Sequence, residues 1–164
     1  MTRSTFIYVS YIRTTPEKLW QALTEPEFTR QYWFGMRAES TGRAGSDWRL
    51  VSRDGEVWDA GVILEADPPR RLAIRWAHQK RSDLRAEGDS ICTMEIEPGD
   101  DGMVKLSITH TVEREHSKLI EAVGGGWPKV ISNLKSLLET GLPLILESHP
   151  PAQVRLGGPP VNRR

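Results

Sequence analysis

The sequence predicts an α+β protein in which a curved antiparallel sheet of six to seven strands wraps around one long C-terminal helix. Three observations favour this class. Short stretches of alternating apolar and polar residues fill the region 36–112, and glycine and proline turns separate them. Residues 127–141 repeat apolar side chains at three- and four-residue spacing, which is typical of an amphipathic helix. Two helix-start signals lie between an N-terminal strand and this meander. The apolar stripe of the long helix must be buried, and the apolar face of the sheet is its partner.

The N-terminal part of the chain predicts a strand and two short helices. Residues 5–13 are rich in β-branched and aromatic side chains, which favours a strand. Thr15 is a suitable N-cap, and the proline that follows it suits the first position of a helix. Thr24 and Glu27 have the spacing of a capping box, so we expect a second short helix that ends near Gly35.

The region 36–112 predicts about six antiparallel strands with one apolar, tryptophan-rich face. Asp54-Gly55 is the clearest tight-turn signal in it. The residues expected to alternate onto the apolar face are Trp48 and Leu50; Trp58, Ala60, Val62 and Leu64; Leu72, Ile74 and Trp76; Met94 and Ile96; and Val104, Leu106, Ile108, His110 and Val112.

The C-terminal helix is predicted in two pieces. Residues 117–123 form the first piece, and Gly124-Gly125-Gly126 interrupts it, either as a plain connector or as a hinge that gates a pocket. Trp127-Pro128 reopens the helix, which ends at Gly141 in a left-handed cap. Residues 1–141 therefore form one domain, and the proline- and glycine-rich residues 142–164 form a tail.

Composition excludes several classes of function. The 164 residues carry 22 basic and 22 acidic side chains, so no basic field for nucleic acid is expected. No stretch is apolar for long enough to predict a membrane span. The single cysteine, Cys92, allows no intramolecular disulfide, and we expect a cytoplasmic protein. The four histidines lack the spacing of a metal site, and no cofactor motif is present, so neither a metal nor a cofactor is predicted.

Several segments resemble one known family. They are Thr14–Glu27, Tyr32-Trp33, Gly61–Glu65, Pro69–Leu72, Val104–His110, Gly126-Trp127 and Asn133–Gly141. Together they resemble the START-like helix-grip superfamily, called SRPBCC, and within it the branch similar to the activator of heat-shock-protein-90 ATPase. The resemblance covers residues 5–141. It implies a helix-grip fold with a cavity between the sheet and the long helix. The same fold serves lipid carriers, hormone receptors, aromatases and cyclases alike. Co-chaperone action in this family involves a further domain, for which we expect this chain to be too short.

Six tryptophans are an unusually large number for a chain of this length, and they suggest an aromatic-walled cavity. Trp20 is assigned to the core. The predicted ligand-binding residues are Trp33, Trp48, Trp58, Trp76, Met94, Ile108, His110, Trp127 and Ile131. His110 is either a satisfied core histidine or the group that orients a ligand, whereas His78 is expected to be exposed at a strand end, next to a charged loop. The alternative for the tryptophans is that they simply fill the space.

Three functions remain open from the sequence. The preferred one is non-catalytic binding of a small hydrophobic or aromatic molecule. The second is an enzyme of the cyclase, dehydratase or hydrolase type, with His110 as acid–base and Tyr8, Tyr11 or Asp59 as a second polar group in the cavity. The third is an interaction module that associates with a chaperone or forms a homodimer through residues 142–146.

Overall fold

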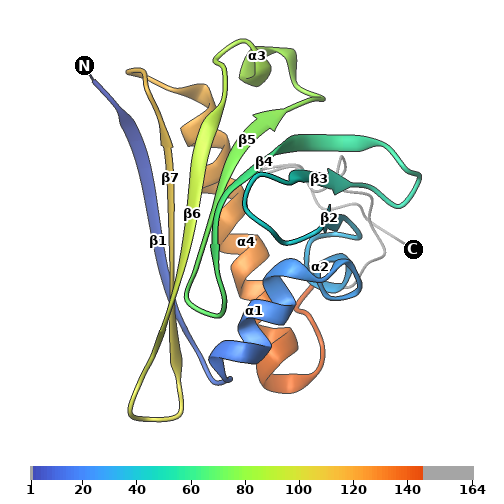
Figure 1. Cartoon of the computed structure of the whole chain (residues 1–164), viewed down its shortest axis with the longest axis vertical. Helices are drawn as coiled ribbons and strands as arrows, with labels where there is room; N and C mark the ends of the chain where they lie inside the picture. The colour runs from blue at the N-terminus through green and yellow to red at the C-terminus, as the bar shows by residue number, and fades with distance from the viewer. Residues whose placement is uncertain (1, 146–164) are drawn as a thin grey trace, which may run out of the picture.

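The structure is a computed structural model, and it describes residues 2–145. These residues form one seven-stranded antiparallel sheet and four helices (Figure 1). The strands lie in the order β1-β7-β6-β5-β4-β3-β2. In chain order the elements are β1 (Ser4–Ile12), α1 (Pro16–Thr24), α2 (Pro26–Tyr32), β2 (Arg37–Ser40), β3 (Asp47–Val51), β4 (Val57–Asp67), β5 (Arg71–His78), α3 (Ser82–Arg85), β6 (Ser90–Pro98), β7 (Val104–Val112) and α4 (Lys118–Thr140). The tail predicted for residues 142–164 lies outside the described part of the chain from residue 146 onward, as does the end of the segment 142–146 that was predicted to mediate association.

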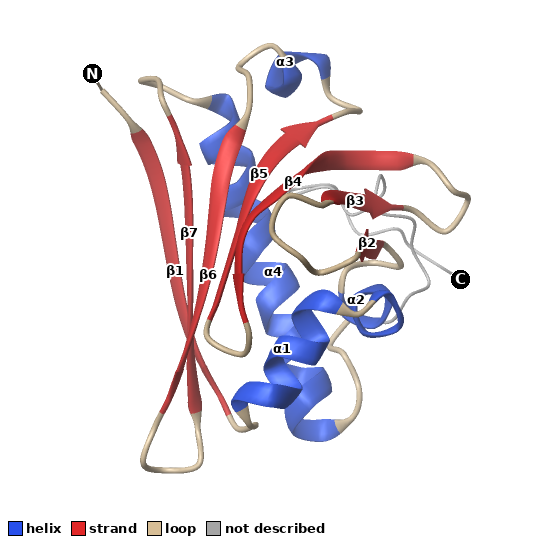
Figure 2. Cartoon of the chain, in the orientation of Figure 1, coloured by secondary structure: helices blue, strands red, loops and turns tan. Residues whose placement is uncertain are grey.

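The sheet curves around α4, as Figure 2 shows, and this arrangement confirms the predicted fold class. Val130, Ile131 and Leu134 on one side of α4 are buried in the hydrophobic core, which they share with residues from the inner face of the sheet. The Nδ2 of Asn133 donates a hydrogen bond of 3.2 Å to the carbonyl of Tyr32 and so ties α4 to the end of α2. No helix within residues 2–145 has the length and the apolar character that crossing a membrane would require.

The two short helices form as expected, but the predicted capping box is wrong. Thr15 caps α1, and its side chain accepts a hydrogen bond from the Lys18 amide. Thr24 is the last residue of α1, and its hydroxyl donates to the Trp20 carbonyl. The N-cap of α2 is Glu25, which makes no side-chain capping bond. The proline that follows forces Glu25 into an extended conformation, so α2 begins one residue later than the capping-box pattern indicates.

The inward-facing side of β4 differs from the prediction. Asp59 and Ile63 are buried, whereas Leu64 is 37% exposed. Opposite residues of paired strands point to the same face, and Gly61 lies opposite Trp48 on β3 and opposite Trp76 on β5. Asp59, Gly61 and Ile63 therefore face the core, whereas the predicted residues Ala60, Val62 and Leu64 lie in the opposite phase. Trp58 is the extra residue where the register of β3 and β4 shifts, and its partly buried side chain packs against the core.

Gly61 makes this arrangement possible. The rings of Trp48 and Trp76, from the strands on either side of it, lie 4.4 Å apart between centroids. A Cβ atom at position 61 would lie 1.8 Å from the carbonyl oxygen of Arg75, far inside contact distance. The close approach of β4 to β5 therefore requires a residue without a side chain.

Helix α4 is continuous, which corrects the predicted interruption at Gly124-Gly125-Gly126. It begins at the N-cap Ser117, whose hydroxyl accepts from the Ile120 amide, and it ends at Gly141 with φ of 88°. Glycine costs a helix only about 1 kcal/mol per residue, and tertiary packing overrides this cost. At Gly124 the missing side chain admits the ring of Phe6 from β1, because an added Cβ would lie 3.3 Å from that ring.

The connection between α3 and β6 is fixed to the start of α4 by Glu87. The carboxylate accepts hydrogen bonds from the Ser117 hydroxyl at 2.6 Å and from the Lys118 amide at 2.8 Å. Burial raises the pKa of the Glu87 carboxyl, but these hydrogen bonds outweigh burial and hold the pKa below its usual value. The Glu87 carboxylate therefore adds a cap to the N-terminus of α4.

Candidate functional site

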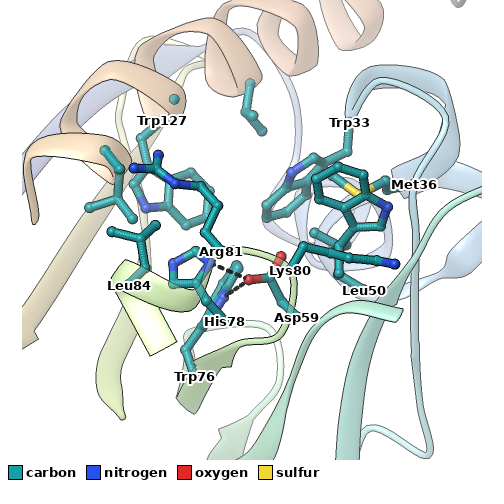
Figure 3. Close-up of a pocket in the computed structure, with 15 residues that line it drawn as sticks. Trp33, Met36, Leu50, Asp59, Trp76, His78, Lys80, Arg81, Leu84 and Trp127 are labelled. Carbon is teal, nitrogen blue, oxygen red and sulfur yellow. Dashed lines mark hydrogen bonds and ion pairs between the residues drawn. The ribbon is translucent and has the colours of Figure 1, made fainter. Parts of the chain in front are cut away.

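A cavity of about 220 Å³ lies between the inner face of the sheet and the N-terminal half of α4 (Figure 3). Four tryptophans dominate its lining: Trp33, Trp58, Trp76 and Trp127. The polar residues that line it are Asp59, His78, Lys80 and Arg81, of which the last two are exposed. The remaining lining residues are Met36, Leu50, Leu84, Ala122, Val123, Gly126 and Val130. The cavity is therefore apolar over most of its surface and polar near the start of β4 and the end of β5.

Three of the tryptophans form one packed group. The ring of Trp33, which follows α2, lies 5.2 Å from that of Trp127 on α4 and 6.0 Å from that of Trp76 on β5. The Trp76 and Trp127 rings are 5.9 Å apart and meet edge to face. These separations are typical of favourable aromatic pairs. Each of the three residues is at least nine-tenths buried, so this wall of the cavity is rigidly held.

An aspartate–histidine pair forms the polar part of the cavity. Asp59 on β4 lies directly opposite His78 on β5. Its Oδ1 is 2.7 Å from Nδ1 of His78 and also accepts a hydrogen bond of 2.9 Å from the indole N–H of Trp76 (Figure 3). Asp59 is only 7% exposed, and these two hydrogen-bond donors, His78 and Trp76, compensate the cost of burying its carboxylate. The Nε2 of His78 is buried and has no hydrogen-bond partner among the described residues.

His110 on β7 lies outside the lining of the cavity, although the sequence suggested it as the polar group of the site. It is fully buried. Its Nδ1 accepts a hydrogen bond of 3.2 Å from the Trp127 indole, and its Nε2 lies 2.6 Å from the Ser90 hydroxyl. Because Nδ1 is an acceptor, the neutral ring carries its proton on Nε2 and donates it to Ser90. Both ring nitrogens are thus occupied within the protein.

Burial lowers the pKa of His110 to about 3, and the nearby His78 adds to this shift. The unfolded chain takes up a proton on this ring near the ordinary value of 6.5, whereas the folded chain does not. We therefore expect the contribution of His110 to fold stability to be complete at high pH and to fall as the pH drops below 6.5, by about 2 kcal/mol at pH 5. Urea unfolding across this range, together with NMR titration of the His110 ring, measures the effect. A ring that titrates near its ordinary pKa in the folded protein would contradict this expectation.

The other predicted ligand-binding residues divide into two groups. Trp33, Trp58, Trp76 and Trp127 line the cavity. Trp48, Met94, Ile108 and Ile131 belong to the buried core and do not line it. Trp48 still contributes indirectly, because its ring packs against that of Trp76.

His78 is a residue of the site that the sequence did not reveal. Its position predicted an exposed strand-end histidine, whereas the side chain is 18% exposed and is paired with Asp59. Of the groups considered as a second polar residue of the cavity, Asp59 lies in it, and Tyr11 is more than half exposed on the other face of the sheet. The signal that links Asp59 to His78 is the register of β4 and β5, which neither residue reveals alone.

Metal-ligating clusters and the thiol of Cys92 are two further candidates for a reactive site. Among residues 2–145, no three His, Cys, Asp or Glu side chains lie together in a way that would hold a metal ion. Cys92 is fully buried, and burial raises the pKa of its thiol, which disfavours the reactive thiolate.

The curved sheet, the long helix across it and the cavity between them define a helix-grip domain of the START-like class. The model of one family in this class, described as activator of Hsp90 ATPase homolog 1-like protein, matches residues 13–139. The chain belongs to this family.

Solved structures show the same fold. An Aha1 dimer from Colwellia psychrerythraea is similar with a TM-score of 0.69 and 18% identity over 84% of this chain and 98% of that one. CalU16 from Micromonospora echinospora gives a TM-score of 0.67 at 21% identity, over 84% of this chain and 77% of that one. An Hsp90 activator from Plasmodium falciparum gives 0.64 at 20% identity, over 82% and 95%. A comparison with curated protein sequences found no match. At these identities the likeness is one of fold.

Proposed function

We propose that the protein binds a small hydrophobic or aromatic molecule in the cavity between the sheet and α4, without altering it. The observation that carries this proposal is a volume of about 220 Å³ whose walls include four tryptophans. Large rings that only filled the core would leave no such space. Flat aromatic walls favour a planar ligand, because offset and edge-to-face contacts then form on several sides.

The volume indicates the size of the ligand. An apolar cavity of about 150 Å³ holds one benzene molecule. A cavity of about 220 Å³ therefore suits a molecule of roughly two fused rings. Naphthalene derivatives are suitable first probes, and quenching of tryptophan fluorescence, confirmed by calorimetry, is the measurement. Saturable binding is expected, whereas an absence of binding in the folded protein would contradict the proposal.

Gly126 offers a sharp test of the site. It lines the cavity, and a Cβ added there would have no neighbour within 4 Å. Because alanine is a better helix former than glycine, Gly126→Ala is expected to raise the free energy of unfolding by about 0.5–1 kcal/mol. The same methyl group narrows the cavity, so the affinity for naphthalene derivatives is expected to fall.

The matched control is Gly124→Ala, two residues earlier on α4. Its methyl group meets the ring of Phe6 and lies away from the cavity. Ligand affinity is expected to be unchanged in this variant. Equal effects of the two substitutions on affinity would place the ligand elsewhere.

A second candidate function is protein association through β1. This strand lies at one end of the sheet, and it exposes Ile7 (63%), Val9 and Tyr11 (53%). An edge strand offers unpaired backbone groups, and a second copy of the chain can extend the sheet there. The similar Colwellia protein is described as a dimer, and the similar Plasmodium protein as an Hsp90 activator, so a homodimer and a chaperone partner both belong to this candidate.

Sedimentation velocity over a range of protein concentrations tests this candidate, and Hsp90 added in a second series tests the chaperone. If β1 mediates association, Val9→Lys lowers the mass of the complex. Leu64→Lys, at an exposed apolar position on β4, is the control and leaves the mass unchanged. A monomer at all concentrations, with no complex with Hsp90, would exclude this function.

A further inference from the structure

We propose that Nε2 of His78, fixed as a hydrogen-bond acceptor by Asp59, selects ligands that carry a weakly acidic hydroxyl group, such as a phenol or an enol. This inference rests on the proposed binding function and names the chemical class that the cavity prefers. It assigns the polar recognition to the Asp59–His78 pair, which lines the cavity, rather than to His110, which does not.

The direction of the hydrogen bond at His78 follows from the chemistry of its partner. An ionised carboxylate only accepts hydrogen bonds, so the Nδ1 of His78, 2.7 Å from Asp59, must carry the proton. In the neutral ring the other nitrogen, Nε2, then has a free lone pair. The Trp76 indole donates to the same carboxylate and helps to hold it in place. Asp59 thus fixes both the orientation and the tautomer of the imidazole.

The Nε2 atom needs a donor, and the described part of the chain does not supply one. It is buried and has no hydrogen-bond partner among these residues. The other polar groups of the lining are already paired: the Nζ of Lys80 lies 2.8 Å from Glu56, and Arg81 lies 2.9 Å from Asp83. A buried polar atom without a partner destabilises the protein, and a ligand that donates a hydrogen bond to it removes this penalty.

The surroundings of Nε2 restrict the donor to a neutral, planar molecule. Trp76 contacts Asp59 directly, and Trp33 and Trp127 pack against Trp76 in the lining of the same cavity. An ammonium group brings up to three donors to this single acceptor atom, whereas a hydroxyl on an aromatic ring brings an apolar body with a single donor. A phenol or an enol meets both requirements.

The test compares two probes of nearly the same shape, 2-naphthol and 2-methylnaphthalene, by calorimetry at pH 8. Only the first can donate a hydrogen bond. The native protein is expected to bind 2-naphthol about tenfold more tightly, which is the value of one buried hydrogen bond.

Two variants separate the acceptor from the rest of the cavity. His78→Asn retains an N–H that reaches Asp59 but removes Nε2, so the preference for 2-naphthol is expected to vanish while 2-methylnaphthalene still binds. In Asp59→Asn the amide accepts from Trp76 through Oδ1, and it can meet Nδ1 of His78 either through the same oxygen or through its N–H, so the tautomer of the ring is no longer fixed. The preference for 2-naphthol is then expected to shrink, and the affinity for 2-methoxynaphthalene, which can only accept, is expected to rise. His116→Asn, the same substitution at an exposed histidine, is the control and changes nothing.

The outcomes distinguish this inference from the proposed function. Equal affinities for the two probes in the native protein, or a preference for 2-naphthol that survives in both variants, would overturn the role of His78 and leave the cavity as a binding site. If neither probe binds to the folded native protein, the proposed function and the inference fail together. Loss of the preference in His78→Asn, or its shift in Asp59→Asn, supports the inference.

Discussion

Replacing Gly61 with alanine is expected to lower the free energy of unfolding by about 3 kcal/mol or more, which is a large part of the stability of a typical domain. The added methyl group would lie 1.8 Å from the carbonyl oxygen of Arg75, and that atom belongs to the backbone of the neighbouring strand. A side chain can rotate away from such a contact, but paired strands can relieve it only by moving apart. Equilibrium denaturation in urea measures the loss.

Gly126→Ala is the matched control for this experiment, because it adds the same methyl group where no atom lies within 4 Å. The two substitutions are expected to change stability in opposite directions. If Gly61→Ala unfolded at the same urea concentration as the native protein, this result would contradict the close approach of β4 to β5.

Trp76→Ala is expected to destabilise the protein by about 4 kcal/mol and to abolish ligand binding. The Trp76 ring contacts those of Trp33, Trp48, Trp127 and His110, so its removal leaves a large space at the centre of the aromatic group. The substitution also removes the indole N–H that donates to the buried carboxylate of Asp59. Thermal and urea unfolding measure the first effect, and calorimetry with a naphthalene derivative measures the second.

Trp58→Ala provides the comparison for Trp76→Ala. Trp58 also lines the cavity, but it is only partly buried, and its ring has Lys80 Nζ 6.0 Å from its centroid. This substitution should weaken ligand binding with a stability loss below about 2 kcal/mol. A similar loss of stability in both variants would show that Trp76 is not the centre of the aromatic group.

Local sequence patterns predicted most of the fold. The N-cap at Thr15, the left-handed cap at Gly141 and the apolar spacing of α4 depend on neighbouring residues, so the sequence displays them directly. Which face of β4 points to the core could not be predicted in this way. Val62 and Leu64 are apolar although they lie on the outer face of the sheet. Only the pairing of β4 with β5 identifies which residues of β4 lie on the inner face.

The candidate site could be predicted only in part, because its polar groups depend on contacts between distant residues. The tryptophans pointed to an aromatic cavity through their number alone. The position of His110 on the inner face was also correct, but its partners Ser90 and Trp127 are 20 and 17 residues away in the sequence. Those partners occupy both ring nitrogens. His78 likewise becomes part of the site only through its contact with Asp59 on the neighbouring strand.

The register of β4 and β5 has a consequence for the comparison of distant relatives. Asp59 lies opposite His78, and Gly61 lies opposite Trp76, so the acidic residue, the histidine and the space for the indole are specified by two short segments. In sequence terms these are Asp-x-Gly on one strand and Trp-x-His on the next. A relative that retains both segments is expected to share the ligand preference proposed for this protein, even at low overall identity. A relative that retains only the glycine and the tryptophan is expected to share the aromatic packing and to differ in what it binds.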